Sequence, residues 1–460
     1  FMRFNYNYKE KYLFEFNGRY DGSSLFPTNR RYNFFPSFSA GYNVAKEKFW
    51  SHLTNILSTF KLRGSYGTLG DVSTLLNQGN YYPYQNALIT QPPNNTNWEF
   101  AGGRQPYVQV GGLTDPNITW AKPSMLDFGL DVAALDNRLQ GTFDWYRRKT
   151  KDLFGPAQSY PSVLGVNPPQ KNNASIQTTG FDLTIGWQDK VGSLSYNASF
   201  ILSNYKGVVL SYPNPSKIIS DWYNGAQMGA IWGYTAVDLF QSQAEIDKSA
   251  KQTKIYSNWK PGDVHYKDLN GDGQIDWGKN TVDSSGDLSI IGNSTPEFSY
   301  GFNFGLTWKG FDLNGFVQGI GERKFFSSSN YFWGITGNQW QGSPLTSNLN
   351  RYTPDNPNGY FPNYYMSGEM NKNMQTSTRY LLNAAYFRMK NLQLGYTVPT
   401  RITNKAHISR LRIYGSVENL FTIAPGLHNK FQVDPEVLIS DSKIYPIQRT
   451  FSVGINLNLQ

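Results

Sequence analysis

The segment Thr295–Gly321 constrains the fold of this chain more than any other stretch, because two strict alternations of apolar and polar residues follow each other in it. Large apolar residues occupy every second position from Phe298 to Trp308, and a second alternation runs over Phe311–Gln318. Side chains of a strand point alternately to opposite faces of a sheet. Two such runs joined by Lys309-Gly310 predict a β-hairpin with one aromatic, apolar face and one polar face.

The same period of two recurs along the whole chain and predicts about thirteen strands. Besides the two runs above, the alternating segments are Phe1–Tyr8, Tyr12–Arg19, Phe34–Val44, Phe60–Tyr66, Leu126–Val132, Leu139–Trp145, Phe181–Trp187, Leu194–Leu202, Leu392–Val398, Leu411–Val417 and Phe451–Leu459. Lys46–Leu57 has the pattern of a short amphipathic helix. Short and long connections alternate, and residues 206–294 form the longest insertion. All long connections are therefore expected at one end of the sheet.

This asymmetry separates two all-β architectures. A Greek-key sandwich has long crossovers at both ends, whereas an outer-membrane barrel has short periplasmic turns and long extracellular loops. The polar faces of the strands also carry charged residues, namely Lys61, Arg63, Asp131, Asp144 and Arg412. Such charges are costly inside a sandwich core but ordinary in a wet lumen. The predicted fold is therefore a transmembrane antiparallel β-barrel with long extracellular loops and short periplasmic turns.

Composition excludes several other classes of protein. No run of 18 apolar residues is present, which excludes a helical membrane span. The chain has no cysteine, so it has neither disulfides nor thiol chemistry. Its net charge of +9 is spread along the chain without the basic cluster of a nucleic-acid-binding protein. Its four histidines are scattered and no hydrolase or phosphate-loop motif occurs, so we expect no enzymatic activity.

The first residues, Phe1–Tyr8, already have the alternating pattern of a strand. We therefore expect that this chain is a piece of a longer protein whose N-terminal part is missing. Bacterial single-chain barrels usually have an even number of strands. An odd set of strands predicts that the missing part supplies an odd number more.

One loop resembles a calcium-binding loop. Oxygen-bearing ligands at positions 1, 3, 5, 7 and 9 would be Asp268, Asn270, Asp272, the backbone carbonyl of Gln274, and Asp276. Gly273 occupies position 6, where the loop turns sharply. Position 12 is Lys279 instead of an acid, so Asp283 or Asp287 would have to substitute through a bulge. The sequence predicts Ca²⁺ here, and an Asn/Gly/Asp turn without metal is the alternative.

Aromatic residues in the long connections are the second candidate site, because sugars and peptides both stack on such rings. They are Trp222, Tyr223, Trp232, Trp259, Tyr331, Phe332, Trp333 and Trp340. The alternative is that these rings pack the loops together or contact another protein. The strand tryptophans Trp145, Trp187 and Trp308 are instead expected at the membrane interfaces.

Short motifs along almost the whole chain carry a family resemblance. They are Tyr20-Asp21-Gly22-Ser23-Ser24, Phe35-Pro36-Ser37, Ala40-Gly41-Tyr42, Lys61–Gly67, Asn137-Arg138-Leu139, Tyr146–Leu153, Gly262-Asp263-Val264, Asp268–Asp276, Ile291-Gly292-Asn293, Val417–Phe421 and Arg449–Ser452. Together and in this order they resemble the C-terminal half of SusC/RagA-type TonB-dependent transporters. The chain departs from that family by ending on Leu459-Gln460, where such barrels usually end on an aromatic residue.

The resemblance implies a 22-stranded barrel with a plugged lumen in the bacterial outer membrane. The plug and the segment that contacts TonB would lie in the missing N-terminal part. A SusD-like surface lipoprotein would cover the barrel, and the imported solute would be an oligosaccharide or a peptide. A secreted or surface β-rich carbohydrate-binding module is the alternative function.

Overall fold

The structure is a computed structural model, and it describes residues 1–459 except 77–80, 93–98, 101, 156–162, 164–167, 170, 337–343, 428–430, 432, 439–444 and 446. Most strand residues belong to one antiparallel sheet of 13 strands. In spatial order these are β1 (Met2–Tyr8), β2 (Tyr12–Gly22), β3 (Tyr32–Asn43), β4 (Leu57–Thr68), β9 (Lys122–Ala134), β10 (Leu139–Phe154), β11 (Asn172–Val191), β12 (Leu194–Ser211), β17 (Glu297–Trp308), β18 (Phe311–Glu322), β21 (Tyr386–Thr397), β22 (Ile408–Ile423) and β23 (Thr450–Leu459).

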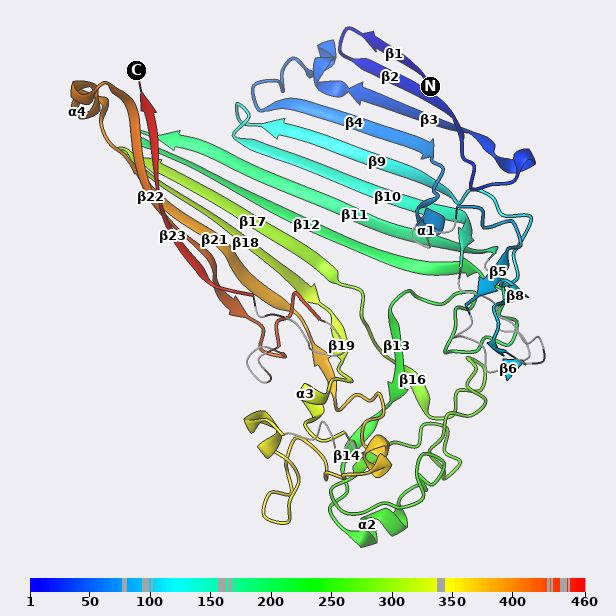
Figure 1. Cartoon of the computed structure of the whole chain (residues 1–460). Coiled ribbons are helices and arrows are strands. Elements are labelled where there is room, and N and C mark those ends of the chain that lie inside the picture. Colours follow the sequence, from blue (N-terminus) through cyan, green and yellow to red (C-terminus); the bar gives the residue numbers. More distant parts are fainter. Residues whose placement is uncertain are drawn as a thin grey trace.

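Neighbours in the sheet are also neighbours along the chain, and the gaps in numbering are short strands inside the long connections. Figure 1 shows the sheet as a strongly curved wall with β1 and β23 at its two edges. Among the described residues, each edge strand pairs on one side only. The fold class predicted from the period of two is confirmed, including the number of strands.

The register gives the sheet one apolar and one polar face. On the apolar face, Phe302 of β17 lies opposite Phe200 of β12 and Val317 of β18. Phe304 lies opposite Gly315, where an added Cβ would come within 2.3 Å of the Phe304 ring. Glycine therefore leaves the space that the aromatic ring occupies. We call the face that carries Phe302 the outer face and the opposite one the inner face.

The hairpin predicted over Thr295–Gly321 is present as β17 and β18, with Trp308 paired to Phe311. Its turn residues Lys309 and Gly310 have φ values of 45° and 92°. Positive φ at both central positions is the requirement of the two-residue turn whose twist matches that of a hairpin. Local sequence therefore determines this element.

The short connections all lie at one end of the sheet and the long ones at the other (Figure 1). The short end contains the β3–β4 connection, where an amphipathic helix was predicted. That prediction is wrong: the structure has two 3₁₀ turns, Val44–Lys46 and Lys48–Trp50, followed by further turns. Another short connection at this end, between β21 and β22, contains the one-turn helix α4 (Thr400–Thr403).

The long connections carry the remaining small elements. They are α1 (Ser73–Leu76), β5 (Leu88–Gln91), β6 (Glu99–Phe100), β7 (Gly103–Arg104), β8 (Tyr107–Val110), β13 (Ala230–Tyr234), β14 (Ala236–Leu239), α2 (Gln243–Lys248), β15 (Val264–Tyr266), β16 (Leu288–Asn293), β19 (Lys324–Phe326), α3 (Asn330–Trp333) and β20 (Leu381–Asn383). None of the helices in the described residues is both long enough and apolar enough to span a membrane.

Candidate functional site

Charged side chains on the inner face form an ion cluster over β4, β9 and β10. The Arg63 guanidinium lies 2.8 Å from an Asp131 oxygen and 2.9 Å from an Asp144 oxygen. The Lys61 ammonium lies 3.9 Å from Asp131. These side chains keep between 26% and 31% of their surface exposed. The inner face is therefore a polar surface with paired charges, as the sequence predicted, and not the dry core of a sandwich.

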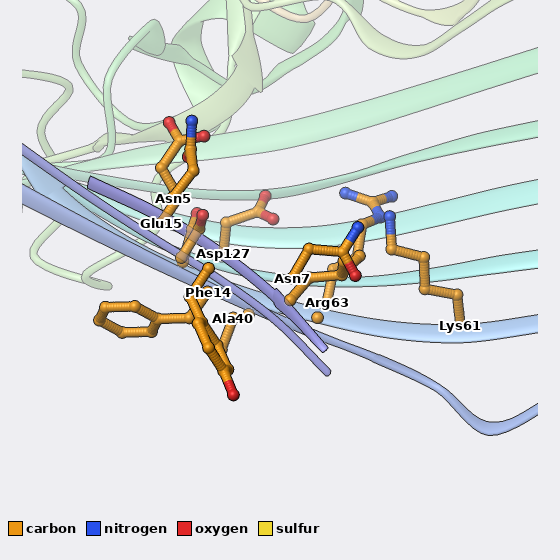
Figure 2. Close-up of a pocket in the computed structure, with 14 residues that line it drawn as sticks. Asn5, Asn7, Phe14, Glu15, Ala40, Lys61, Arg63 and Asp127 are labelled. Atoms are coloured by element: carbon orange, nitrogen blue, oxygen red, sulfur yellow. The ribbon is translucent and has the colours of Figure 1, made fainter. Parts of the chain in front are cut away.

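A concavity of about 450 Å³ adjoins this cluster and is bordered by β1 to β4 and β9. Figure 2 shows Asn5, Glu15 and Asp127 on its polar side together with Arg63 and Lys61. The Glu15 carboxylate is already bound by Arg3 at 2.7 Å. This mixture of amide, acidic and basic groups fits hydrogen bonding to a polar solute or to a polar segment of another chain.

On β21, a second charged region of the inner face holds the β22–β23 connection against the sheet. Arg388 is 1% exposed, and it binds Glu436 and, at 2.5 Å, Asp434. Lys390 donates to Glu436 at 2.9 Å. Because a buried guanidinium requires acidic partners, these contacts fix the described part of the connection over the inner face.

Beyond the end of the sheet that carries the long connections, three of these connections share one hydrophobic core, which we call the loop hub. They are the β12–β17 connection, the β18–β21 connection and the β22–β23 connection. Its buried side chains include Phe240, Val264, Trp333, Phe361, Tyr380 and Leu427. The connections are therefore one packed unit on the rim of the sheet and not independent loops (Figure 1).

A buried ion pair lies inside the loop hub. The Lys372 ammonium is 2.6 Å from an Asp263 oxygen, and neither side chain has any exposed surface. Lys372 also contacts the Tyr365 ring at 4.4 Å, and Tyr365 donates a hydrogen bond of 2.8 Å to Asp263. Burial, together with the nearby Asp263 charge, raises the pKa of the Tyr365 hydroxyl well above its usual value. Surrounding donors and rings thus compensate the charges that the hub buries.

Several of the predicted aromatic residues belong to this packing. Trp259 and Trp333 are 7% and 0% exposed, and their indole N–H groups each donate 2.8 Å hydrogen bonds to backbone carbonyls. Phe332 is buried beside Trp333, whereas Tyr331 is exposed. For Trp259 and Trp333 the structure favours the packing alternative that the sequence left open.

The other aromatic candidates are spread over different parts of the connections. Trp222 is partly buried and packs on Tyr212, and Tyr223 is buried. Trp232 lies half-buried on β13, and Trp340 lies outside the described residues. The structure does not bring Trp222, Tyr223 and Trp232 together into one surface, and the role of all four residues in substrate binding stays a prediction.

The calcium-like loop is held mainly by side-chain to backbone hydrogen bonds. The Asp268 carboxylate accepts from the backbone N–H of Gly271 at 2.6 Å and of Gly273 at 2.9 Å. The side chains of Asn270 and Asp272 accept in the same way from residues two positions further on, 272 and 274. No group of three or more acidic or histidine side chains in the described part of the chain is arranged to hold a metal ion. Calcium binding by Asp268, Asn270, Asp272, Gln274 and Asp276 stays a prediction.

Asp287 closes this loop in a way that the sequence only partly indicated. Its carboxylate is fully buried and accepts hydrogen bonds from the backbone N–H groups of Leu269 at 2.7 Å and Asp276 at 2.9 Å. The sequence named Asp287 as a replacement ligand. The structure uses it to tie both ends of the loop together.

Sequence reasoning missed the contacts of Arg388 with Asp434 and Glu436 and the pairing of Asp263 with Lys372. The two partners of the latter pair are separated by more than one hundred positions, and no local pattern joins them. A basic residue on an otherwise polar strand face was the only available signal for Arg388.

Comparison with known proteins places the whole chain in one group. No protein-family model matches it. It is 30% identical to TonB-dependent receptor P3 of Formosa agariphila, over 99% of this chain and 45% of that protein. It is 27% identical to TonB-dependent receptor SusC of Bacteroides thetaiotaomicron, over 99% of this chain and 43% of SusC. The chain thus spans less than half the length of these relatives.

Solved structures agree on the fold. The RagAB peptide importer in its closed-closed state matches 99% of this chain with a TM-score of 0.76 at 23% identity, and 47% of the importer chain is covered. The curved sheet and its connections therefore have the same fold as part of the RagAB importer chain. The chain belongs to the TonB-dependent receptors that include SusC, and it forms a section of their β-barrel in the outer membrane.

Proposed function

We propose that this chain forms part of the barrel wall and extracellular loops of an importer that carries a bulky nutrient across the outer membrane. One observation carries the proposal: a 13-stranded antiparallel sheet combines an apolar outer face, a charged inner face and long connections at one end only. Contact with lipid requires the apolar outer face, and a hydrated pathway for solutes requires the charged inner face. The likeness to the RagAB peptide importer and to SusC supports this use of the fold.

The transport mechanism is binding and release, without covalent chemistry. The inner face and the loop hub would hold the solute by hydrogen bonds and ring contacts, and TonB would provide energy through a plug. We propose that the plug and the strands that pair with the free edges of β1 and β23 come from a segment of the receptor outside this chain. Such edges invite pairing, and barrel closure removes them.

A SusD-like surface lipoprotein is the proposed partner of the loop hub. The hub has a buried hydrophobic core, and the exposed Tyr331 and Trp277 in the same connections leave apolar surface for a partner. The proposed solutes are oligosaccharides or peptides. RagAB, which has the same fold, is a peptide importer, and this likeness supports the peptide class.

The decisive experiment is purification of the native receptor from outer membranes in mild detergent. We expect a surface lipoprotein and the plug-bearing segment to copurify, with an oligosaccharide or peptide detectable by mass spectrometry. Deleting the receptor should abolish growth on that solute class and spare growth on its monomers. A chain that is soluble and monomeric without detergent, and that binds glycans, would instead support a secreted carbohydrate-binding module.

A further inference from the structure

The β3–β4 connection, Val44–Ile56, is the short connection with the most exposed apolar surface. Phe49 is 66% exposed, Leu53 45% and Ile56 59%. Polar and basic residues surround them, including the exposed Lys46 and Lys48. Exposed large apolar side chains beside lysines are typical of segments that lie in a membrane interface.

Contacts with the sheet show on which face this connection lies. The Trp50 ring stacks on Phe60 with centroids 5.4 Å apart and an angle of 22° between planes. Phe60 pairs with Val132, so it belongs to the apolar outer face. The Glu47 carboxylate accepts from the hydroxyl of Tyr12, another outer-face residue, at 2.9 Å. The connection therefore folds against the lipid-facing side of the sheet and not beneath the lumen.

Basic residues surround the connection at the same end of the sheet. We call the six short connections with their flanking charged residues the turn rim. Its acids are all paired: Glu10 with Lys46, Glu47 with Lys11, Asp136 and Asp189 with Arg138, and Asp312 with Arg412. Among the described residues, no acid lies within ion-pair distance of the exposed Lys9, Lys48, Lys190, Lys309, Arg401, Lys405 or Arg410.

Two of these lysines lie against rings of the outer face. The Lys9 ammonium is 5.3 Å from the centre of the Tyr8 ring, and the Lys309 ammonium is 5.3 Å from that of Trp308. Tyrosine and tryptophan prefer the headgroup level of a bilayer. Their rings therefore place the free ammonium groups at the depth of lipid phosphates.

We propose that the turn rim binds the headgroups of anionic phospholipids, with the Phe49, Leu53 and Ile56 side chains inserted in the periplasmic leaflet beside the barrel. This inference rests on the outer-membrane placement of the chain and is independent of the solute carried. Negative surface charge attracts each nearby basic residue, and the apolar side chains lose contact with water. The rim would thus select the lipids that surround the receptor and fix its depth in the membrane.

The test measures lipid retention by the native receptor. The receptor is delipidated, incubated with phosphatidylglycerol and phosphatidylethanolamine in equal amounts, and its bound lipid is quantified by mass spectrometry. A variant combining Lys48→Gln, Lys190→Gln and Lys309→Gln should lose the preference for phosphatidylglycerol by at least about tenfold, since each lysine near an anionic surface contributes about fivefold. The matched control combines Lys248→Gln, Lys254→Gln and Lys279→Gln, which are exposed in the β12–β17 connection.

The control should keep the wild-type preference. Equal loss in both variants, or an unchanged preference in the rim variant, would overturn the proposal. A rim variant that retains lipid but no longer cosediments with peptidoglycan would assign the basic rim to that polymer instead.

A second measurement addresses insertion and does not depend on headgroup charge. The chain has no cysteine, so a nitroxide can be attached after Leu53→Cys, with Thr253→Cys in the loop hub as the aqueous control. In nanodiscs, the label at position 53 should collide more often with oxygen than with a water-soluble nickel chelate, and the control label should do the reverse. Equal accessibility to the chelate at both positions would contradict insertion.

Discussion

The ammonium group of Lys372 lies 2.6 Å from the carboxylate of Asp263, and both side chains are completely buried in the loop hub. This ion pair joins the β12–β17 connection to the β18–β21 connection. Two groups that each need the other therefore set the relative position of two segments that are far apart in sequence.

Replacing one partner should destabilise the hub strongly. In Lys372→Met, Asp263 keeps a buried charge without its ammonium partner, so we expect a loss of about 3–5 kcal/mol in the free energy of hub opening. Native-state proteolysis of the hub measures this loss. The double variant Lys372→Met/Asp263→Asn should recover part of the stability, and a double variant as sensitive as the sum of both single variants would contradict the pairing.

We expect Arg388 to hold the β22–β23 connection against the inner face of the sheet. In Arg388→Gln the acids Asp434 and Glu436 lose their guanidinium partner, and hydrogen bonds to charged groups contribute about 1.5–3 kcal/mol. We expect trypsin to cleave within residues 424–449 roughly tenfold faster in folded receptor. Lys405→Gln on the turn rim is the control and should leave cleavage unchanged. Equal cleavage of wild type and Arg388→Gln would show that other contacts hold the connection.

The loop hub should lose stability in mild acid because of His265. Its ring stacks on Phe240 at 4.4 Å, and its Nδ1 lies 3.3 Å from Glu245. Burial lowers the pKa of His265, and the attraction of Glu245 opposes that effect only in part. A lowered pKa means that the unfolded hub binds the proton more readily. The neutral His265 ring therefore stabilises the folded hub fully above the pKa of the unfolded state, about 6.5. This contribution is lost as the pH falls toward the lower pKa of the folded state.

Proteolysis of the hub at pH 7.5 and pH 5.5 tests this dependence. Wild type should be cleaved faster at the lower pH, and His265→Gln should reduce the difference between the two. A difference that persists in full in His265→Gln would assign the pH response to other groups.

The calcium prediction has a direct test at the loop that Asp268 begins. If the loop holds Ca²⁺, a chelator should speed proteolysis between residues 264 and 290, and Asp268→Asn/Asp272→Asn should be equally sensitive with or without chelator. Calorimetric titration of the receptor with Ca²⁺ should show a site that the variant lacks. Identical cleavage of wild type in calcium and in chelator would contradict calcium binding. It would mean that hydrogen bonds such as those from Gly271 and Gly273 to Asp268 hold the loop without metal.

The strands and their faces were predictable from the sequence. The alternation from Phe298 to Trp308 fixes which side chains share a face, because the period of a strand is two wherever the strand lies. The turn Lys309-Gly310 fixed the register of β17 and β18, and the structure confirms it in the pairing of Trp308 with Phe311. Charged inner-face residues such as Arg63 were also recognised from the same period.

The connections were not predictable to the same degree. Lys46–Leu57 has helical spacing, yet contacts of Trp50 with Phe60 and of Glu47 with Tyr12 hold it in 3₁₀ turns on the outer face. The sequence does not distinguish Trp333 from an exposed binding residue, because the rings that pack against it, Phe361 and Tyr380, come from distant positions.

The sequence by itself thus determined the strands, their two faces and the end at which the long connections lie. These properties depend on residues that are close along the chain, because the two-residue period of a strand alternates its side chains between two environments. Only the tertiary structure decided that three connections share one core, that Asp263 finds Lys372, and that Arg388 holds Asp434. Those contacts join residues distant along the chain, and their free energy exists only once the curved sheet has brought the connections together.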